Sequence, residues 1–261
     1  MHKFFAKTLF LGKKVIFLPE CHSTNESLSN LCKIEFLPEG TVVWSDYQTK
    51  GRGQRGNGWE SIKGKNLLAS VLLRPKWLTI ADQFYLTFIS GLAIRKSIQE
   101  RVKMDVKVKW PNDVYVREKK IAGILTEASI SSRSLDSAVV GFGINLNQDE
   151  FQNQAAVSIY NLINEVTDRE ELLSAVLRDL EYYLMKLKAG KSRELLEEYF
   201  ENMLGYGEIR TFAAKGEFQG KIVGVDSKGC LEIMVHTAGN TSLIEGARAT
   251  FGLKEISMLL Q

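Results

Sequence analysis

Residues 106–127 read Val-Lys-Val-Lys-Trp-Pro-Asn-Asp-Val-Tyr-Val-Arg-Glu-Lys-Lys-Ile-Ala-Gly-Ile-Leu-Thr-Glu, and this stretch decides the fold class. Apolar and β-branched runs at 106–110 and 114–116 flank a Pro-Asn-Asp segment with the composition of a turn. Strand-like runs follow at 121–127 and 138–146, with a serine-rich segment between them. Successive short strands joined by short turns form a hairpin ladder, so we predict a mostly antiparallel sheet.

The residues before this stretch predict more strands and two helices. Strands are expected at Val15–Leu18, at 41–47 and at Leu67–Leu73, where the apolar run is continuous. Ser23-Thr24-Asn25-Glu26 fits a capping box, with Ser23 as N-cap of a short helix through Leu31. Apolar residues recur at helical spacing over residues 80–100.

The residues after it predict a helical segment and then a small β unit. Thr167-Asp168-Arg169-Glu170 fits a second capping box before a long amphipathic helix that Gly190 ends. Another helix is expected at 192–203, and short strands with glycine turns fill residues 208–251. We therefore expect two domains, 1–204 and 205–261, with the boundary near Leu204.

Composition narrows the class of protein. Lys and Arg number 34 against 31 Asp and Glu, so the net charge is only +3 and demands no nucleic-acid partner. The three cysteines lack metal-ligand spacing and suit a reducing compartment. Lysines interrupt the apolar N-terminus, which favours folded chain over a signal peptide, and no run approaches membrane-spanning length. A cytoplasmic protein without membrane contact is expected.

A glycine-rich loop, Gly51-Arg52-Gly53-Gln54-Arg55-Gly56, matches G-x-G-x-x-G. A dinucleotide-binding fold needs a helix directly afterwards, but Asn57-Gly58 opposes helix initiation. Gly-Lys-Ser/Thr is missing, which excludes a Walker loop, and the kinase motifs are missing as well. What remains is a loop whose two arginines and backbone amides can approach an anion, or a tight solvent-exposed turn.

The Pro-Asn-Asp turn gathers groups that can bind a nucleotide. Lys109 precedes the turn, Asn112 and Asp113 form its tip, and Lys120 returns on the next strand. Two lysines, an amide and a carboxylate can bind a phosphate, a purine edge and a divalent cation. A plain hairpin with exposed lysines is the competing interpretation.

Five ordered motifs together resemble the biotin protein ligases. They are Ser23-Thr24-Asn25, the Gly-Arg-Gly loop with Gln48 before it, Lys109-Trp110-Pro111-Asn112-Asp113, Lys120-Ile121-Ala122-Gly123-Ile124-Leu125 and Gly141-Phe142-Gly143-Ile144-Asn145. Residues after 204 resemble the family's small SH3-like barrel by placement and composition, so the similarity covers nearly the whole chain.

The resemblance implies an α+β fold. Its larger part is a mixed, mostly antiparallel sheet with flanking helices, like the catalytic core of class II aminoacyl-tRNA synthetases. Its smaller part is the C-terminal SH3-like β-barrel. Some members carry a helix-turn-helix that makes them repressors. Here the catalytic motifs begin at Ser23, so we expect no such unit and no DNA binding. A homodimer remains open.

The implied activity is that of an ATP-dependent ligase. Such an enzyme forms biotinyl-5′-AMP and passes biotin to one lysine of a biotin carboxyl carrier protein, a carboxylase subunit. Its substrates are ATP and biotin. Mg²⁺ is expected because triphosphate chemistry needs charge neutralisation, although its ligands are unknown.

The resemblance also implies roles for individual residues. The expected catalytic residues are Arg52, Lys120 and Asp113. The expected biotin-binding residues are Ser23, Thr24, Asn25, Gln48, Arg52, Gly53, Gln54 and Lys120. The expected ATP-binding residues are Arg55, Trp59, Lys109, Asn112 and Asn145.

Some of these residues have competing interpretations. Ser23 fits a helix cap as well as a ligand contact, and Trp59 fits a loop aromatic packed on the core as well as a lid. Gln54 and Asn57 stand where the family often has arginine, which leaves Arg52 and Arg55 to meet the phosphates.

Two other functions compete with the biotin ligase. A lipoate or octanoate ligase would carry an Arg-Arg-x-Ser-Gly-Gly-type loop and a His-Asp pair, which are not present. A non-catalytic biotin-binding protein would keep Ser23, Thr24 and Gln48 and lose Lys109 and Asn112. Because Lys109 and Asn112 are retained, the sequence favours an enzyme.

Overall fold

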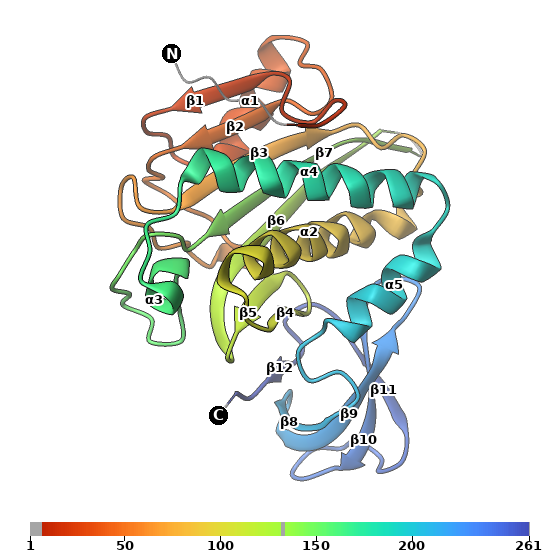
Figure 1. Cartoon of the computed structure of the whole chain (residues 1–261). Coiled ribbons are helices and arrows are strands. Elements are labelled where there is room, and N and C mark those ends of the chain that lie inside the picture. The colour runs from red at the N-terminus through yellow and green to blue at the C-terminus, as the bar shows by residue number, and fades with distance from the viewer. Residues whose placement is uncertain (1–6, 132–133, 261) are drawn as a thin grey trace.

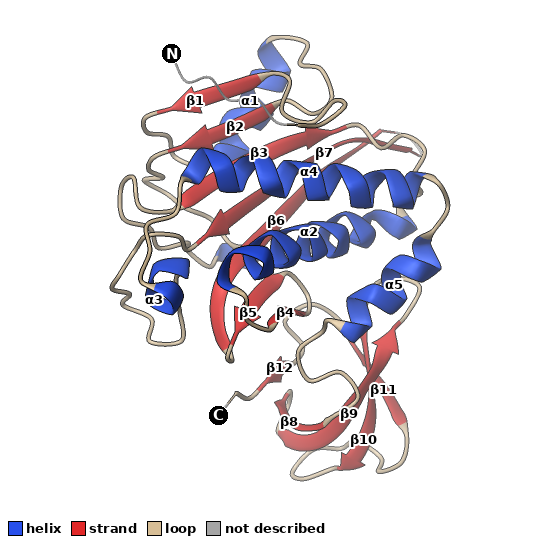
Figure 2. Ribbon diagram, in the orientation of Figure 1, coloured by secondary structure: helices blue, strands red, loops and turns tan. Residues whose placement is uncertain are grey.

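The computed structural model describes residues 7–131 and 134–260, and a seven-stranded sheet is its centre (Figures 1 and 2). The strand order is β1-β2-β3-β7-β6-β5-β4, and only β1 and β2 pair in parallel. The strands are β1 (Val15–Leu18), β2 (Val42–Ser45), β3 (Leu67–Leu73), β4 (Val106–Lys109), β5 (Asp113–Val116), β6 (Lys119–Ser131) and β7 (Ser134–Ile144). The prediction of a mostly antiparallel sheet is therefore confirmed.

The helices lie on both faces of this sheet. In Figure 1, α2 (Phe84–Val102) and α4 (Arg169–Lys188) cross the near face, and α1 (Thr24–Ile34) lies behind it. Side chains alternate accordingly, because successive residues of a strand point to opposite faces. Val42 and Val71 pack in the core shared with α2 and α4, whereas Val43 and Leu72 pack with Leu28 of α1.

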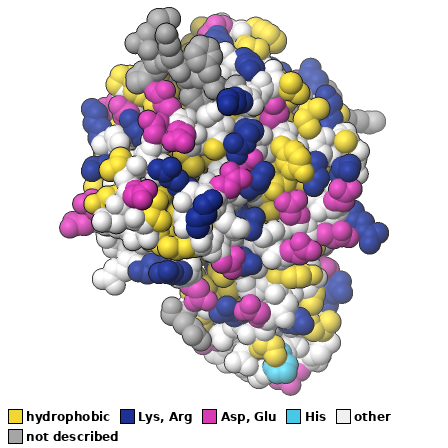
Figure 3. Space-filling view, viewed as in Figure 1, with side chains coloured by type: hydrophobic (Ala, Val, Ile, Leu, Met, Phe, Trp, Pro, Cys, Tyr) yellow, Lys and Arg dark blue, Asp and Glu magenta, His cyan; other side chains and the backbone are white. Residues whose placement is uncertain are grey.

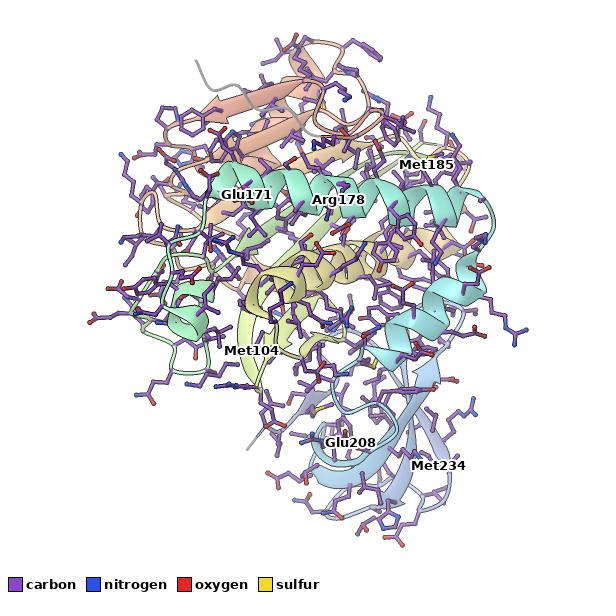
Figure 4. The ribbon with its side chains drawn as sticks, in the orientation of Figure 1. Met104, Glu171, Arg178, Met185, Glu208 and Met234 are labelled. Carbon is purple, nitrogen blue, oxygen red and sulfur yellow. The ribbon has the colours of Figure 1, made fainter. Side chains whose placement is uncertain are left out.

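Buried polar contacts fix α4 against α2. The carboxylate of Asp179 on α4 is 1% exposed and accepts hydrogen bonds from Lys96 Nζ at 3.1 Å and Ser97 Oγ at 2.9 Å. Arg178, labelled in Figure 4, reaches Glu100 of α2 at 3.2 Å. A buried carboxylate needs such partners to offset its desolvation, so this network sets how the two helices align.

A second sheet of five strands forms the C-terminal part. Its order is β11-β10-β9-β8-β12, and all its pairs are antiparallel. The strands are β8 (Ile209–Ala213), β9 (Glu217–Val225), β10 (Leu231–Thr237), β11 (Arg248–Phe251) and β12 (Ser257–Met258). Phe218 stacks between Phe212 and Phe251, with ring centroids 5.6 and 5.7 Å apart, and these rings form its apolar centre.

The two sheets are joined where β4 turns into β5. The indole Nε1 of Trp110 donates a hydrogen bond to the carbonyl of Gly229 at 3.0 Å. Beyond the short helix α5 (Ser192–Glu201), the chain runs beside β4: Val108 N–H donates to Asn202 O and Leu204 N–H to Val108 O. The helix expected over 192–203 ends at Glu201, because Asn202 and Leu204 form backbone hydrogen bonds with the edge of β4.

Both predicted capping boxes are wrong in detail. Ser23 is the N-cap of α1 by position, but its side chain makes no capping hydrogen bond, and the helix continues to Ile34. At α4 the cap is Asp168, which accepts from Glu171 N–H at 2.9 Å. Thr167 instead donates its backbone N–H to Asn147, so a long-range contact displaces the local motif.

The N-terminal segment is tied to α4. Both carboxylate oxygens of Glu181 accept backbone N–H groups of residues 9–11, two of them at 2.8 and 3.0 Å. The expectation of a folded N-terminus holds from Thr8 to Leu11, whereas residues 1–6 lie outside the described residues. No helix within residues 7–131 and 134–260 is both long and apolar enough to cross a membrane.

Candidate active site

A cavity of about 200 Å³ opens on the face of the sheet that carries α1. Its wall combines the start of α1, the glycine-rich loop, the β4–β5 turn, the centres of β6 and β7, and two C-terminal residues. The lining residues are Ser23, Thr24, Asn25, Gln48, Arg52, Gly53, Gln54, Asn57, Gly58, Trp59, Trp110, Pro111, Asn112, Asp113, Lys120, Gly123, Ile124, Leu125, Gly141, Phe142, Gly143, Lys254 and Ile256.

Glycines on neighbouring strands make room for the Trp59 indole. Gly123 and Gly143 are cross-strand partners in β6 and β7. A Cβ on Gly143 would lie 2.4 Å from the indole, and one on Gly123 would lie 3.0 Å from it. Trp59 therefore lies flat on a surface that only glycine provides, and its buried Nε1 has no hydrogen-bond partner in the described structure.

The floor of the cavity is polar, and its residues on α1 are buried. Gln48 Oε1 accepts the backbone N–H of Thr24 at 2.7 Å and lies 3.1 Å from the Thr24 hydroxyl. Thr24 and Ser23 are 4% and 3% exposed. Ser23 lies in the cavity wall, which agrees with its side chain not capping α1.

Asn25 fixes how closely α1 approaches the sheet. A Cβ on Gly141 would lie 2.0 Å from Asn25 Oδ1, so this glycine allows the asparagine to sit directly on β7. The Asn25 amide donates to Leu125 O at 3.1 Å and to Glu127 Oε2 at 2.8 Å. Asn25 thus lines the cavity while its amide hydrogens are bound to protein acceptors.

Lys120 carries its charge into the cavity. Its Nζ lies 2.7 Å from Asp113 Oδ1 and 5.7 Å from the centre of the Trp59 ring. The Lys120 backbone is fixed as well, because its N–H donates to Ala155 O and its carbonyl accepts from Val157 N–H. Lys119, on the other side of the strand, is exposed. Adjacent residues of a strand point to opposite faces, which separates the two lysines.

Lys109 and Asn145 stand behind the cavity wall. Neither is among the lining residues. Burial lowers the pKa of Lys109, with Asp113 acting in the opposite direction and Lys120 reinforcing the decrease. Asn145 is 4% exposed and donates to Val157 O at 3.1 Å and Lys120 O at 3.4 Å, so it supports the strand that presents Lys120.

The glycine-rich loop folds back on itself. Gly53 N–H donates to Asn57 O at 2.7 Å and Trp59 N–H to Gly51 O at 3.0 Å, which brings Arg52 and Trp59 to the cavity. The Arg52 guanidinium forms an ion pair with Glu127 on β6. Gln54 also lines the cavity, whereas the side chain of Arg55 lies outside the described residues.

The β4–β5 turn supplies the remaining predicted residues. Asn112 and Asp113 both line the cavity, and Asn112 Nδ2 donates to Ile124 O at 2.6 Å. The Trp110–Pro111 peptide bond of this turn is cis. The structure thus brings Asn112, Asp113 and Lys120 together, as the nucleotide-binding interpretation of this turn expected, whereas Lys109 does not line the cavity.

Sequence reasoning missed the C-terminal contribution to the site. Lys254 and Ile256 line the cavity although about a hundred residues separate them from the last motif. It also missed Glu127, which contacts both Arg52 and Asn25. No local pattern marks such residues, since only the folded chain brings them to the cavity.

The described residues offer no ready-made metal cage. Among residues 7–131 and 134–260, no group of three or more His, Cys, Asp or Glu side chains is placed to hold a metal ion. Asp113 is the carboxylate on the cavity wall. This donor set fits Mg²⁺ that arrives on a nucleotide, because Mg²⁺ commonly uses one or two carboxylates together with substrate phosphates and water.

Known proteins share both the sequence pattern and the fold. The family described as "Biotin/lipoate A/B protein ligase family" matches residues 18–145. The bifunctional ligase/repressor BirA of Bacillus subtilis is 31% identical over 237 residues, which are 88% of this chain and 72% of the relative. The biotin–[acetyl-CoA-carboxylase] ligase of Mycobacterium tuberculosis is 29% identical over 206 residues, or 75% and 74% of the two chains.

A solved structure extends the similarity to the C-terminal sheet. The biotin protein ligase of Aquifex aeolicus, in complex with biotin and ATP, superimposes with a TM-score of 0.77 at 32% identity. The match covers 95% of this chain and all of that one. The fold is therefore that of a protein ligase. The chain belongs to the Biotin/lipoate A/B protein ligase family, on its biotin protein ligase branch.

Proposed function

We propose that this protein activates biotin with ATP to biotinyl-5′-AMP and transfers the biotin to one lysine of a biotin carboxyl carrier protein. The observation that carries the proposal is Lys120, whose ammonium enters a cavity lined by polar groups and by the Trp59 indole. Support also comes from the Aquifex structure, which holds biotin and ATP on the same fold.

The first step joins two anions. A biotin carboxylate oxygen attacks the α-phosphorus, a new P–O bond forms, and the bond to pyrophosphate breaks. Positive charge fixed at this junction stabilises the transition state more than it stabilises the separated reactants. In our proposal Lys120 lies at the carboxylate and the bridging oxygen, and Arg52 covers the same junction from the loop.

The second step needs an unprotonated amine. The acceptor lysine, with an ordinary pKa near 10.4, attacks the biotinyl carbonyl and AMP leaves with the bridging oxygen. We propose Asp113 as the group that takes the proton, because it is the carboxylate on the cavity wall and is held by Lys120. It is also the side chain that could reach Mg²⁺ brought in by ATP.

The two ends of the cavity suit the two substrates. Ser23, Thr24 and Gln48, with the loop residues Gly53 and Gln54, offer the donors and acceptors that a ureido ring needs. In the same proposal Asn25 acts at the biotin end, where it supports the floor of the cavity.

The ATP end uses Trp59, Asn112 and the loop arginine Arg55. The Trp59 N–H, which lacks an acceptor in the described structure, is a free donor there. Lys109 and Asn145 act from behind the wall. Lys109 adds positive charge beside Lys120, and Asn145 supports the strand of Lys120.

The finer features of the fold belong to the same proposal. We propose a catalytic domain at 1–204, with a core like that of class II aminoacyl-tRNA synthetases, and an SH3-like barrel at 205–261. The separate seven- and five-stranded sheets support this division. We further propose action in the cytoplasm, no DNA partner, and a homodimer as one possible assembly.

Biotinyl-AMP formation tests the proposal directly. The protein is incubated with biotin, Mg²⁺ and α-labelled ATP, and the labelled products are separated. We expect biotinyl-AMP, followed by labelled carrier protein when an acceptor domain is added. Replacing biotin with lipoate should give no adenylate, since a dithiolane does not use the hydrogen-bonding floor. Equal turnover of lipoate would assign the protein to the lipoate ligases instead.

A further inference from the structure

A chain of hydrogen bonds crosses the cavity floor from Gln48 to Asn25. Gln48 contacts Thr24, and the Ser70 hydroxyl on β3 lies 2.7 Å from Thr24 Oγ1 and 2.6 Å from Asn25 Oδ1. Ser70 is 0% exposed and Asn25 3%, so water does not compete for these contacts. Each member therefore fixes the next.

The chemistry of the groups sets the direction of this chain. The Asn25 amide nitrogen faces two acceptors, Leu125 O and the Glu127 carboxylate, which fixes the amide orientation. Asn25 Oδ1 can then only accept, so the Ser70 proton points to it. The chain ends on Glu127, the charged acceptor that Asn25 reaches at 2.8 Å.

Glu127 connects this floor to the glycine-rich loop. Its Oε2 accepts from Asn25, and its Oε1 is paired with Arg52 Nη2. Asn25 lies 102 positions and Arg52 75 positions away along the chain, so one carboxylate joins segments that are brought together only by folding. A guanidinium has five N–H donors in a rigid plane, and pairing at one nitrogen leaves other donors for an anion.

We propose that Glu127 is a positioning residue for adenylation: it holds the Arg52 guanidinium at the cavity and ties the glycine-rich loop to the hydrogen-bonded chain Gln48–Thr24–Ser70–Asn25. This rests on the proposed function.

Whether neutralising Glu127 speeds or slows adenylation distinguishes a positioning role from a purely electrostatic one. A carboxylate near a phosphate site repels the substrate, so if Glu127 acted by charge alone, neutralising it would speed the reaction. If it positions Arg52, neutralising it slows the reaction because the guanidinium must be ordered anew in each turnover. The two mechanisms predict opposite changes.

The test measures single-turnover formation of biotinyl-AMP by Glu127→Gln, with biotin affinity measured by calorimetry. We expect the rate to fall about 10-fold, less than the roughly 10²–10³ lost with a direct charged contact, and biotin affinity to change much less. An unchanged or faster rate would overturn the proposal. Wild-type protein that makes no biotinyl-AMP would instead refute the proposed function.

A double variant shows whether Glu127 acts through Arg52. Arg52→Ala with Glu127→Gln should be no slower than Arg52→Ala alone, because interacting residues are not additive. Independent, multiplying losses would contradict the proposal.

Asp136→Asn is the matched control. It removes an exposed carboxylate of β7 that pairs with Lys76 at 3.4 Å, and it should keep the wild-type rate. Thermal unfolding of each variant reports on folding. Should Glu127→Gln unfold, Glu127→Asp keeps the charge with a shorter reach and is expected to slow adenylation as well.

Discussion

Three glycines decide which side chains can enter the cavity. Gly123 and Gly143 leave the space in which the Trp59 ring packs against the sheet, and Gly141 lets Asn25 approach the sheet. None of the three has a positive φ, so they are needed for space and not for backbone conformation. At this scale the site is defined as much by missing side chains as by charged ones.

Lys120 gives the most direct prediction at this scale. Lys120→Ala removes the charge that offsets repulsion between carboxylate and phosphate, and we expect biotinyl-AMP formation to fall about 10²–10³-fold. Lys119→Ala, which removes an exposed lysine of the same strand, should cost little. Rates are measured in both variants after circular dichroism has confirmed folding. A large loss of rate in Lys119→Ala, or near-normal rates in both variants, would contradict the placement of Lys120 at the reacting groups.

Gly143→Ala tests the packing of Trp59 against the sheet. The added methyl group would lie 2.4 Å from the indole, so Trp59 must move, at an overpacking cost of about 1–3 kcal/mol. We expect weaker ATP binding by calorimetry, while the protein stays folded. Gly224→Ala in β9 is the control, because its Cβ would meet only an ordinary 3.5 Å contact. Normal ATP affinity in Gly143→Ala would mean that Trp59 does not serve the nucleotide.

Sequence reasoning reaches individual residues only where a local rule applies. The period of a strand separates Lys119 from Lys120, and a Pro-Asn-Asp turn places Asn112 and Asp113 at a tip. Ser23 fits both a helix cap and a ligand contact in the sequence; it is the N-cap of α1 by position, its side chain makes no capping hydrogen bond, and it lies in the cavity wall. Lys254 could not be found at all, since only tertiary structure brings it there.

At the scale of elements, the periodicity of apolar residues predicts where long strands and helices lie, but it does not predict the residues at which they end. The strand Leu67–Leu73 has the predicted bounds because its continuous apolar run is buried on both faces. The long helix begins after Asp168 because Asn147 engages Thr167. Ends are set by contacts with distant segments, which local sequence does not encode.

The glycine-rich loop is the element expected to respond to substrates. Its cavity side holds Arg52 and Trp59, so we expect the adenylate to bind both and to stabilise a closed form, in which the loop lies against the cavity. Limited trypsin digestion after Arg52 and Arg55 should slow markedly with biotinyl-AMP present, as followed by mass spectrometry. Cleavage at Lys228, an exposed lysine in the turn between β9 and β10, serves as the internal reference. Equal protection with and without adenylate would argue against closure.

The contact between Glu181 and the N-terminal segment should contribute to the stability of the protein. Glu181→Ala leaves three backbone N–H groups of residues 9–11 without their acceptor, and we expect a loss of about 1–3 kcal/mol in the free energy of unfolding. Glu197→Ala removes an exposed helical carboxylate paired with Arg193 and should cost under about 0.5 kcal/mol. Urea unfolding measures both. Equal stabilities would show that the segment contributes nothing.

At the scale of the whole molecule, the net charge is small. Figure 3 shows Lys and Arg interspersed with Asp and Glu over the face of α2 and α4, without a large patch of one sign. The net charge of +3 agrees with this view. Such a surface supplies little of the nonspecific phosphate attraction on which DNA binding depends.

We therefore expect no specific binding to biotin-operon DNA. A gel shift over a range of salt concentrations measures this, with the Bacillus subtilis ligase/repressor as the positive control. The low net charge should leave at most weak binding that is lost at moderate salt. A specific, salt-sensitive complex would refute the expectation.

The cavity wall has a consequence for synthesis of the protein on the ribosome. Lys254 and Ile256 complete the cavity, and the Trp110 indole needs the Gly229 carbonyl for its hydrogen bond. A nascent chain that has already folded its seven-stranded sheet would still have an unfinished substrate pocket. Competence to handle a reactive adenylate would then arrive only once translation has passed Ile256, so a prematurely terminated chain would not release that intermediate into the cell.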